Sequence, residues 1–392
     1  MIEVPTHGMA HGGDAVGRVD GKVYFVPGAM PGEKVAGTIE RDRGSWARLS
    51  MTSVLEPSPH RVEPPCPHFD VCGGCQWQFA THDAQAEWKR SIVVEQLAHI
   101  GKIHDVEVHE TVTTESVGYR NRLDVRIKDG VPGLRKAASH DLAPIDSCLI
   151  AHAGLNELFD CLRGTDLTSA TLRVGTATGD RLLVHTGGTL RVPDGVSVAK
   201  MTKRGLGTVI GDPFITEKVA GKTFRVTGTN FFQVNTAGAE VLVDLVTRAL
   251  QPRSEDVLLD AYAGGGLFSA TVGAGCFHSI AVESDPGGLA DLARNVPEAE
   301  RIAKRVEHLD GGEWDLVVAD PPRAGLRAAG VAAITSAGPR AIALVSCDPA
   351  SLARDSRLLI DSGYTLVGVT PVDMFPHTFH IEAVAHFARA GA

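Results

Sequence analysis

The chain has 392 residues, of which 43% are hydrophobic and 22% are charged, a composition typical of a folded protein with two or three domains. Its 47 Asp and Glu outnumber its 38 Lys and Arg, so the net charge of −9 excludes a protein that is basic throughout. The first residues lack the apolar core of a secretory signal, and no run of about 18 apolar residues occurs. We therefore expect a cytoplasmic protein that does not enter a membrane.

Residues 1–58 are expected to form a small β-barrel. The stretch GDAVGRVDGKVYFVPGAMPGEKVAGTIE alternates small or apolar residues with polar ones, and turn signals occur at Asp20-Gly21 and Pro31-Gly32. Short strands at this spacing are typical of closed barrels that bind oligonucleotides. The proline-rich stretch EPSPHRVEPPCP then ends this domain as a linker.

Cysteines cluster directly after the linker. Cys66, Cys72 and Cys75 lie within ten residues, in a chain with seven cysteines altogether. The odd total and the expected reducing compartment argue against disulfides. Zinc sites usually have two C-x₂-C pairs or spaced histidines, and this region has one such pair, with His68 and His82 nearby. The pattern favours an iron–sulfur cluster and leaves zinc as the alternative.

A [4Fe–4S] cluster needs a fourth thiolate, which is often distant in sequence. Cys148 and Cys161 are the nearest candidates along the chain. Cys148 follows the turn-like stretch APIDS, whereas Cys161 lies in the helix-like run HAGLNELFDCL and is expected to belong to the core. Cys148 is therefore the preferred fourth ligand.

Residues 59–228 are expected to form a mixed central domain. A helix should begin after a cap at Thr81 and stop at Gly101. Runs such as LDVRI, ATLRVG and RLLVHTGG favour an antiparallel sheet over residues 118–228. The stretch YRNRLDVRIKDGVPGLRK has six Lys or Arg against two Asp, which suits RNA phosphates or a solvated strand face.

The pattern changes in residues 229–392. Short apolar runs in EDVLLDAYAGGG, HSIAVESD, WDLVVADPPRAG and AIALVSCDPASL alternate with segments of helix length. This alternation predicts a doubly wound parallel α/β domain. The last two strands, near 364–370 and 381–388, are joined by a loop too short for a helix and should form an antiparallel hairpin at the sheet edge.

A glycine turn in LLDAYAGGGLFS favours a nucleotide-like ligand. Gly264 and Gly266 lie where the first strand of this domain turns into a helix. The third glycine of the dinucleotide fingerprint is missing, and Asp260 before the turn fits an S-adenosylmethionine site better. Glu283 at the end of the next strand suits ribose hydroxyls, and Asp320 in ADPPRAG lies at another strand end, where a helix cap is the alternative role.

Several segments together resemble the bacterial RNA 5-methyluridine methyltransferases. They are VSCDPASLARD, DPPRAG, FFQVN, DMFPHTFHIE and the cysteine cluster. The closest likeness is the subgroup with an N-terminal TRAM barrel and an iron–sulfur cluster, and it covers nearly the whole chain, more loosely before residue 60. The resemblance implies an OB-like barrel, a central iron–sulfur domain and a Rossmann-like methyltransferase domain. It also implies S-adenosylmethionine-dependent methylation of uridine carbon 5 in rRNA or tRNA, and we expect a monomer.

The resemblance assigns a role to particular residues. Cys347 in VSCDP becomes the nucleophile and Glu382 in HTFHIE the general base. The methyl-donor contacts become Gln233, Tyr262, Gly264, Glu283 and Asp320, and the cluster ligands become Cys66, Cys72, Cys75 and Cys148.

The chain departs from the family pattern beside the nucleophile. Asp348 stands where the family commonly has Asn, and Ser351 where it has Thr. Pro349 predicts a helix start here, and a helix N-terminus favours the thiolate of Cys347. The charge of Asp348 should act in the opposite direction and raise the pKa of that thiol.

Other interpretations stay open at this point. His377 and His380 flank Glu382 and are alternative bases. A second hypothesis is an RNA-binding iron–sulfur protein whose methyltransferase-like domain is not catalytic. A third is another nucleic-acid methyltransferase, although amino-methylating enzymes favour an aromatic residue where this chain has Arg323, and DNA cytosine enzymes have proline where Ser346 precedes Cys347.

Overall fold

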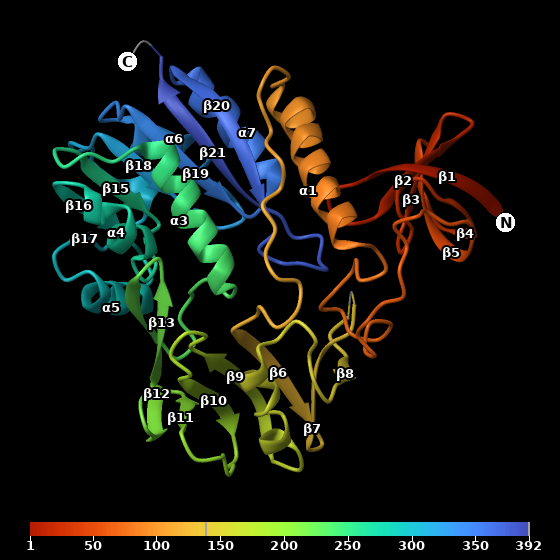
Figure 1. The fold of residues 1–392 in the computed structure, drawn as a ribbon, viewed down its shortest axis with the longest axis horizontal. Coiled ribbons are helices and arrows are strands. Elements are labelled where there is room, and N and C mark those ends of the chain that lie inside the picture. Colours follow the sequence, from red (N-terminus) through yellow and green to blue (C-terminus); the bar gives the residue numbers. More distant parts are fainter. Residues whose placement is uncertain (138, 391–392) are drawn as a thin grey trace.

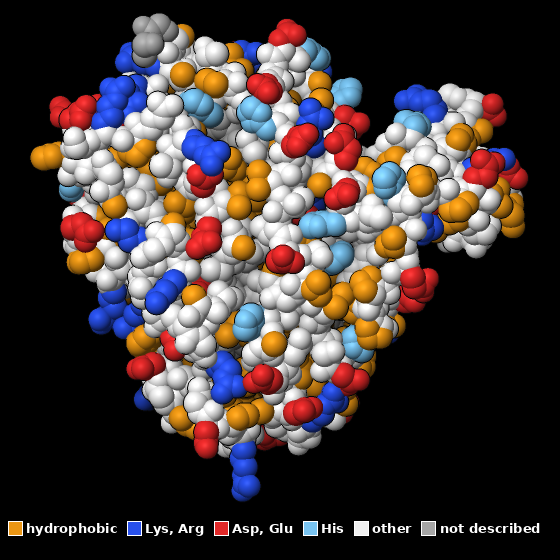
Figure 2. Space-filling model, in the orientation of Figure 1, with side chains coloured by type: hydrophobic (Ala, Val, Ile, Leu, Met, Phe, Trp, Pro, Cys, Tyr) orange, Lys and Arg blue, Asp and Glu red, His pale blue; other side chains and the backbone are white. Residues whose placement is uncertain are grey.

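The computed structural model describes residues 1–137 and 139–390. Figure 1 shows an N-terminal barrel, a C-terminal sheet covered by helices and a central sheet beside them. Within the described residues, none of the helices is both long enough and apolar enough to span a membrane. On the face seen in Figure 2, Lys and Arg are scattered among Asp and Glu, with no broad area of one sign.

The first five strands close into a barrel in the order β1-β2-β3-β5-β4, as the sequence predicts. Side chains of β1 alternate between buried and exposed, as expected for a strand with one face on a core. Gly17 permits a close strand approach, because a Cβ there would lie 2.3 Å from Val4 Cγ1. The strands are β1 (Ile2–Met9), β2 (Ala15–Val19), β3 (Lys22–Val26), β4 (Lys34–Asp42) and β5 (Trp46–Glu56).

A long helix, α1 (His82–Gln96), lies beside the barrel and packs with residues of both the barrel and the C-terminal domain (Figure 1). It begins after Thr81 as predicted, although the Thr81 side chain makes no capping hydrogen bond. A π-helical turn, η1 (Leu97–Gly101), follows, and its Gly101 approaches the helix α7 (Pro349–Asp361) so closely that a Cβ would lie 2.8 Å from Ala353 O. This glycine therefore serves packing between helices.

The central sheet has the order β12-β11-β10-β9-β6-β7-β8 and is antiparallel except for the parallel pair β10–β11. The predicted antiparallel sheet is thus confirmed apart from that pair. The helix-like run around Cys161 is instead two short turns, α2 (Ala153–Asn156) and η2 (Asp160–Leu162). The strands are β6 (Arg122–Lys128), β7 (Val131–Arg135), β8 (Leu142–Pro144), β9 (Leu167–Val174), β10 (Arg181–Gly187), β11 (Val196–Thr202) and β12 (Gly205–Ile210), and β13 (Phe214–Val219) and β14 (Lys222–Thr227) form a separate hairpin.

The C-terminal sheet has the order β17-β16-β15-β18-β19-β21-β20. Its first five strands are parallel, and β20 and β21 form the predicted antiparallel edge pair. The strands are β15 (Val257–Ala261), β16 (His278–Val282), β17 (Glu300–Ile302), β18 (Leu316–Ala319), β19 (Ala341–Ser346), β20 (Tyr364–Val372) and β21 (Glu382–Arg389). The helices are α3 (Thr236–Leu250), α4 (Leu267–Thr271), α5 (Pro286–Asn295), α6 (Arg327–Thr335) and α7 (Pro349–Asp361), with the 3-10 turns η3 (Gly273–Gly275) and η4 (Val306–His308).

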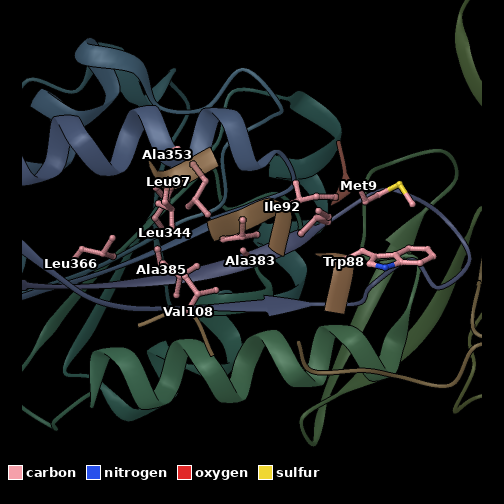
Figure 3. Packing of buried hydrophobic residues seen from close by; sticks show 14 of the residues in the cluster. Met9, Trp88, Ile92, Leu97, Val108, Leu344, Ala353, Leu366, Ala383 and Ala385 are labelled. Carbon is pink, nitrogen blue, oxygen red and sulfur yellow. The ribbon is translucent and has the colours of Figure 1, made fainter. Parts of the chain in front are cut away.

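Two hydrophobic clusters cover the two faces of this sheet. Residues of α3, α4 and α5 pack on one face, and residues of α1, α6 and α7 pack on the other. The second cluster continues into the barrel, where Met9 packs near Trp88 of α1 (Figure 3). Residues 82–112 fall within the range 59–228 expected for the central domain, yet they pack largely on the C-terminal sheet. Val108 and Val112 form isolated β-bridges to strand β20. The domain boundaries stay a prediction.

Candidate active site

A cavity of about 1130 Å³ lies at the carboxyl ends of the parallel strands. Strands β15 and β18 are neighbours although they are far apart in sequence, and the crevice at such a switch point is where open α/β sheets bind ligands. The turn after β15 forms one wall, with positive φ at Tyr262, Gly264 and Gly266. A Cβ on Gly266 would lie 2.7 Å from Leu292 Cδ1, so the third turn position requires glycine for packing as well as conformation.

The predicted methyl-donor residues all line this cavity: they are Gln233, Tyr262, Gly264, Glu283 and Asp320. The Glu283 carboxylate accepts hydrogen bonds from the backbone N–H of Gly264 at 2.8 Å and of Ser284 at 2.6 Å, which fixes it against the glycine turn. Gln233 Nε2 donates to Asp320 Oδ2 at 3.4 Å. The cavity wall thus combines a fixed carboxylate with backbone that a ligand can approach closely.

Cys347 and Glu382 line the same cavity. Cys347 follows β19 and precedes α7, so its predicted place at a helix start is confirmed. Burial, followed by the charges of Glu382 and Asp320, raises the pKa of the Cys347 thiol to about 12, and the charge of Arg323 acts in the opposite direction. Burial and these acids outweigh the helix N-terminus, so the free protein holds this group as a thiol.

The expected influence of Asp348 on Cys347 is not found, because Glu382 and Asp320 are the acids that raise the thiol pKa. Asp348 is the N-cap of α7, where its Oδ1 accepts from Ser351 N at 2.7 Å. Its other oxygen, Oδ2, lies 3.4 Å from His11 Nε2. The carboxylate is therefore engaged away from the sulfur.

Buried acids continue beneath the cavity. Burial raises the pKa of Asp260 to about 6 and that of Asp320 to about 7, with Asp260 adding to the shift of Asp320. Burial, followed by the charge of Asp320, raises the pKa of Glu382 well above its usual value. A carboxylate with a raised pKa takes up a proton more readily than an ordinary one, which suits a general base. Asp320 is no helix cap, since α6 begins at Arg327.

The two alternative bases lie in different places. His380 lines the cavity, and burial, followed by the charge of Arg323, lowers its pKa to about 4. His377 is not among the lining residues; its N–H donates to Gln85 Oε1 at 2.8 Å, and its carbonyl accepts from Trp77 N at 2.9 Å. His377 thus holds the loop, while His380 faces the cavity.

Sequence reasoning missed other groups around the cavity. Tyr262 Oη donates to Glu307 Oε1 at 3.0 Å, and no motif marks Glu307. Arg323 was noted only for the absence of an aromatic residue, yet it is the cation beside Cys347. Its position directly after Asp-Pro-Pro at a strand end was the available signal.

The four predicted cluster cysteines, Cys66, Cys72, Cys75 and Cys148, line a second cavity of about 360 Å³. Cys161 is not among its lining residues. Burial raises the pKa of Cys75 to about 12, and the other three thiols add to the shift. Gly74 N donates to Cys72 Sγ at 3.4 Å.

Of the two histidines considered as zinc ligands, one lies at this second cavity and the other does not. His68 lines it, but His82 Nε2 instead lies 3.0 Å from Asp373 Oδ2. Among residues 1–137 and 139–390, no group of three or more His, Cys, Asp or Glu side chains has the arrangement of a site for a metal ion. The two cavities share the residues Arg120, Phe375 and His380, so the thiols and the active-site cavity are neighbours.

The sheet order, the glycine turn and the strand-end cavity define the fold of S-adenosylmethionine-dependent methyltransferases, here joined to an N-terminal closed barrel. The chain is 33% identical to an uncharacterized RNA methyltransferase of Gloeobacter violaceus, over 99% of this chain and 96% of that protein. It is 34% identical to one of Streptomyces coelicolor, over 98% and 92% of the two chains. The chain therefore belongs to the RNA methyltransferase family, as its motifs indicate.

A solved structure is similar over the whole length. The Pyrococcus abyssi tRNA (uracil-54, C5)-methyltransferase in complex with S-adenosyl-L-homocysteine has a TM-score of 0.80 and 25% identity, covering 99% of this chain and 100% of that chain. No model of a known protein family matches the chain. The iron–sulfur subgroup stays a prediction.

Proposed function

We propose that this protein transfers a methyl group from S-adenosylmethionine to carbon 5 of a uridine in rRNA or tRNA, acting as a monomer. The observation that carries the proposal is one cavity lined by Cys347, Glu382 and the five methyl-donor residues named above. The full-length likeness to a tRNA uracil-C5 methyltransferase supports the same reaction.

The residues suit the chemistry that this reaction needs. Carbon 5 of uracil is a weak nucleophile, and thiolate addition at carbon 6 makes it reactive by forming an enolate. We assign the attack to Cys347, whose high thiol pKa means that it must lose its proton after the substrates enter. After methylation a base must remove the carbon-5 proton so that the thiolate can leave, and we assign this step to Glu382.

The methyl donor is assigned to the half of the cavity formed by the glycine turn. We propose that Glu283 and Tyr262 hold its nucleoside part, and that Gln233 and Asp320 hold the part nearest the reacting carbon. Gln233 already contacts Asp320 at 3.4 Å, and both lie in the cavity with Cys347. A carboxylate beside a sulfonium cation is electrostatically favourable.

Mapping of methylated uridines tests the function directly. Total rRNA and tRNA from a strain that lacks the gene should have lost one or more 5-methyluridines, and the purified protein with S-adenosylmethionine should restore them. A Cys347→Ala protein should restore none. RNA with an unchanged set of 5-methyluridines would refute the proposal.

We further propose that Cys66, Cys72, Cys75 and Cys148 hold a [4Fe–4S] cluster. Thiolates on one zinc ion, at about 2.3 Å from it, lie only about 3.8 Å apart, whereas each ligand of a cubane binds a separate iron. Four thiols around one cavity match the number of thiolates that a cubane needs. In this place a cluster supplies a structural cross-link between the linker and the central sheet.

Metal analysis of anaerobically purified protein tests the cluster. The protein should be brown and contain about four irons per chain. Cys148→Ala should lose the colour, and the matched variant Cys161→Ala should keep it, because Cys161 does not line the cavity. A colourless protein with one zinc per chain would contradict this assignment.

A further inference from the structure

The turn between β1 and β2 of the barrel lies against the loop that carries Cys347. The turn is closed by hydrogen bonds from Ala10 N to Asp14 O at 2.9 Å and from Gly13 N to Ala10 O at 3.0 Å. Gly12 and Gly13 have φ of +105° and +93°, which other residues rarely adopt. The turn therefore has a defined shape that presents His11 at its tip.

His11 contacts the residue next to the proposed nucleophile. His11 Nε2 lies 3.4 Å from Asp348 Oδ2, with 33% and 27% of the two side chains exposed. The second oxygen of the same carboxylate caps α7 through Ser351 N at 2.7 Å. One carboxylate thus joins the barrel to the first turn of the helix that follows Cys347.

Two further contacts fix the turn in place. Gly13 packs against the loop before β21, where a Cβ would lie 2.9 Å from Phe379 Cβ. Its carbonyl accepts from Nε1 of the fully buried Trp77 at 3.1 Å. Met9, at the start of the turn, belongs to the hydrophobic cluster that covers the C-terminal sheet (Figure 3). The barrel therefore packs directly against the loops before α7 and β21, in addition to being linked to them along the chain.

We propose that His11 is a positioning residue: through Asp348 it holds the loop 346–351 so that Cys347 points into the cavity. The inference rests on the proposed function, because it takes Cys347 as the nucleophile. A misplacement of about 1 Å at a reacting group costs roughly 100-fold in rate, so a single contact beside that group affects the chemical step. The barrel then contributes to the reaction rate as well as to RNA binding.

Single-turnover methylation at saturating RNA and S-adenosylmethionine tests the role. His11→Ala should lower this rate by up to about fivefold, the effect of losing one partly exposed ion pair, with RNA affinity changed less than about twofold. His11→Gln keeps a donor and should recover most of the rate. The matched control is His7→Ala, which alters an exposed histidine of β1, the strand that leads into the turn, and should leave the saturated rate unchanged.

A double-mutant cycle shows whether His11 acts through Asp348. In an Asp348→Ala background, His11→Ala should have no additional effect on the saturated rate. Fully additive losses would overturn the inference, as would a wild-type rate in His11→Ala. A loss confined to RNA affinity would also overturn it, because His11 would then be an RNA contact.

A measurement without catalysis separates this inference from the proposed function. Hydrogen–deuterium exchange of the peptide that contains 346–352 should be faster in the full-length His11→Ala protein than in wild type. Unchanged protection would overturn the inference even if the wild-type protein methylates uridine. Faster exchange in a protein that methylates no uridine would support the loop contact and refute the proposed function.

Discussion

Replacing Glu382 by Gln should separate the two halves of the proposed reaction. In wild type the Cys347 thiol has a pKa of about 12, against 9.0 for an unperturbed thiol, and the Glu382 charge is the second-largest cause. At pH 8 such a thiol is ionised in roughly one molecule in ten thousand, about a thousandfold less than an ordinary cysteine. The neutral Gln removes one acid that opposes ionisation, so attack by Cys347 should proceed at least as fast as in wild type.

The second half of the reaction should instead stall in this variant. Removal of the carbon-5 proton loses its base, an effect of roughly 10²–10⁴-fold. With RNA and S-adenosylmethionine, Glu382→Gln should accumulate a denaturation-resistant protein–RNA species that carries the transferred methyl. Denaturing electrophoresis and mass spectrometry of a nuclease-trimmed peptide should locate the bond on Cys347, and Cys347→Ala should form no such species.

Two outcomes would refute this reasoning. If Glu382→Gln turns over at the wild-type rate, the base is another group, and His380 is the next candidate because it lines the cavity. If the adduct maps to Cys276, the nucleophile is wrong.

Melting temperatures show whether Glu382→Gln loses activity because it misfolds. The folded-state pKa of Glu382 is raised, so its stabilising contribution is complete below its unfolded pKa and is lost as pH rises through the folded value. Gln mimics the protonated acid, and the variant should therefore match wild type in melting temperature at pH 4, below the unperturbed pKa of 4.5, and exceed it at pH 9. A lower melting temperature at both pH values would indicate damage to the fold.

The remaining predictions concern a buried ion pair and the RNA surface. Lys89 Nζ lies 2.5 Å from Asp373 Oδ1 and both side chains are fully buried, so Lys89→Met should cost about 3–5 kcal/mol in the free energy of unfolding, whereas Lys22→Met, at an exposed pair, should cost less than about 1 kcal/mol. Thermal or urea unfolding checks both values, and equal losses would contradict the argument. Arg126 is exposed on β6, and Arg126→Ala should weaken RNA binding without changing S-adenosylmethionine affinity. It should also reduce by about one the slope of log binding constant against log salt concentration, while Arg248→Ala on α3 should change neither RNA binding nor this slope. An unchanged slope for Arg126→Ala would exclude a phosphate contact.

Local patterns were sufficient for much of the fold. The alternation of short apolar runs and helices after residue 229 gave the parallel sheet, because buried parallel strands need such runs. The segment between β20 and β21 is too short for a crossover helix, and this predicted that the two strands pair antiparallel at the sheet edge. In the N-terminal domain, turn residues such as Asp20-Gly21 marked the ends of short strands, and their regular spacing predicted the closed barrel that is observed.

Contacts between distant segments were beyond such patterns. Lys89 and Asp373 are 284 positions apart, and neither has a local signal that predicts the other. The run around Cys161 had helical periodicity, yet it forms two short turns under the central sheet. Similarly, residues 82–112 follow the cysteines in sequence but pack on the C-terminal sheet, since the apolar face of α1 meets α7 there.

The setting of Cys347 shows why a motif gives the identity of a site more readily than its chemistry. In the sequence, the charged residue nearest to Cys347 is Asp348, and the predicted helix start favoured a thiolate at Cys347. In the structure, Asp348 faces α7 and the barrel, while Glu382 and Asp320 arrive from two other strands and act on the sulfur. A thiol pKa depends on burial and on charges in space, so neighbours in sequence are poor guides to it. The same three-dimensional packing that brings the acids to the sulfur also brings His11 to Asp348, so the surroundings of this cysteine are built by segments from both ends of the chain.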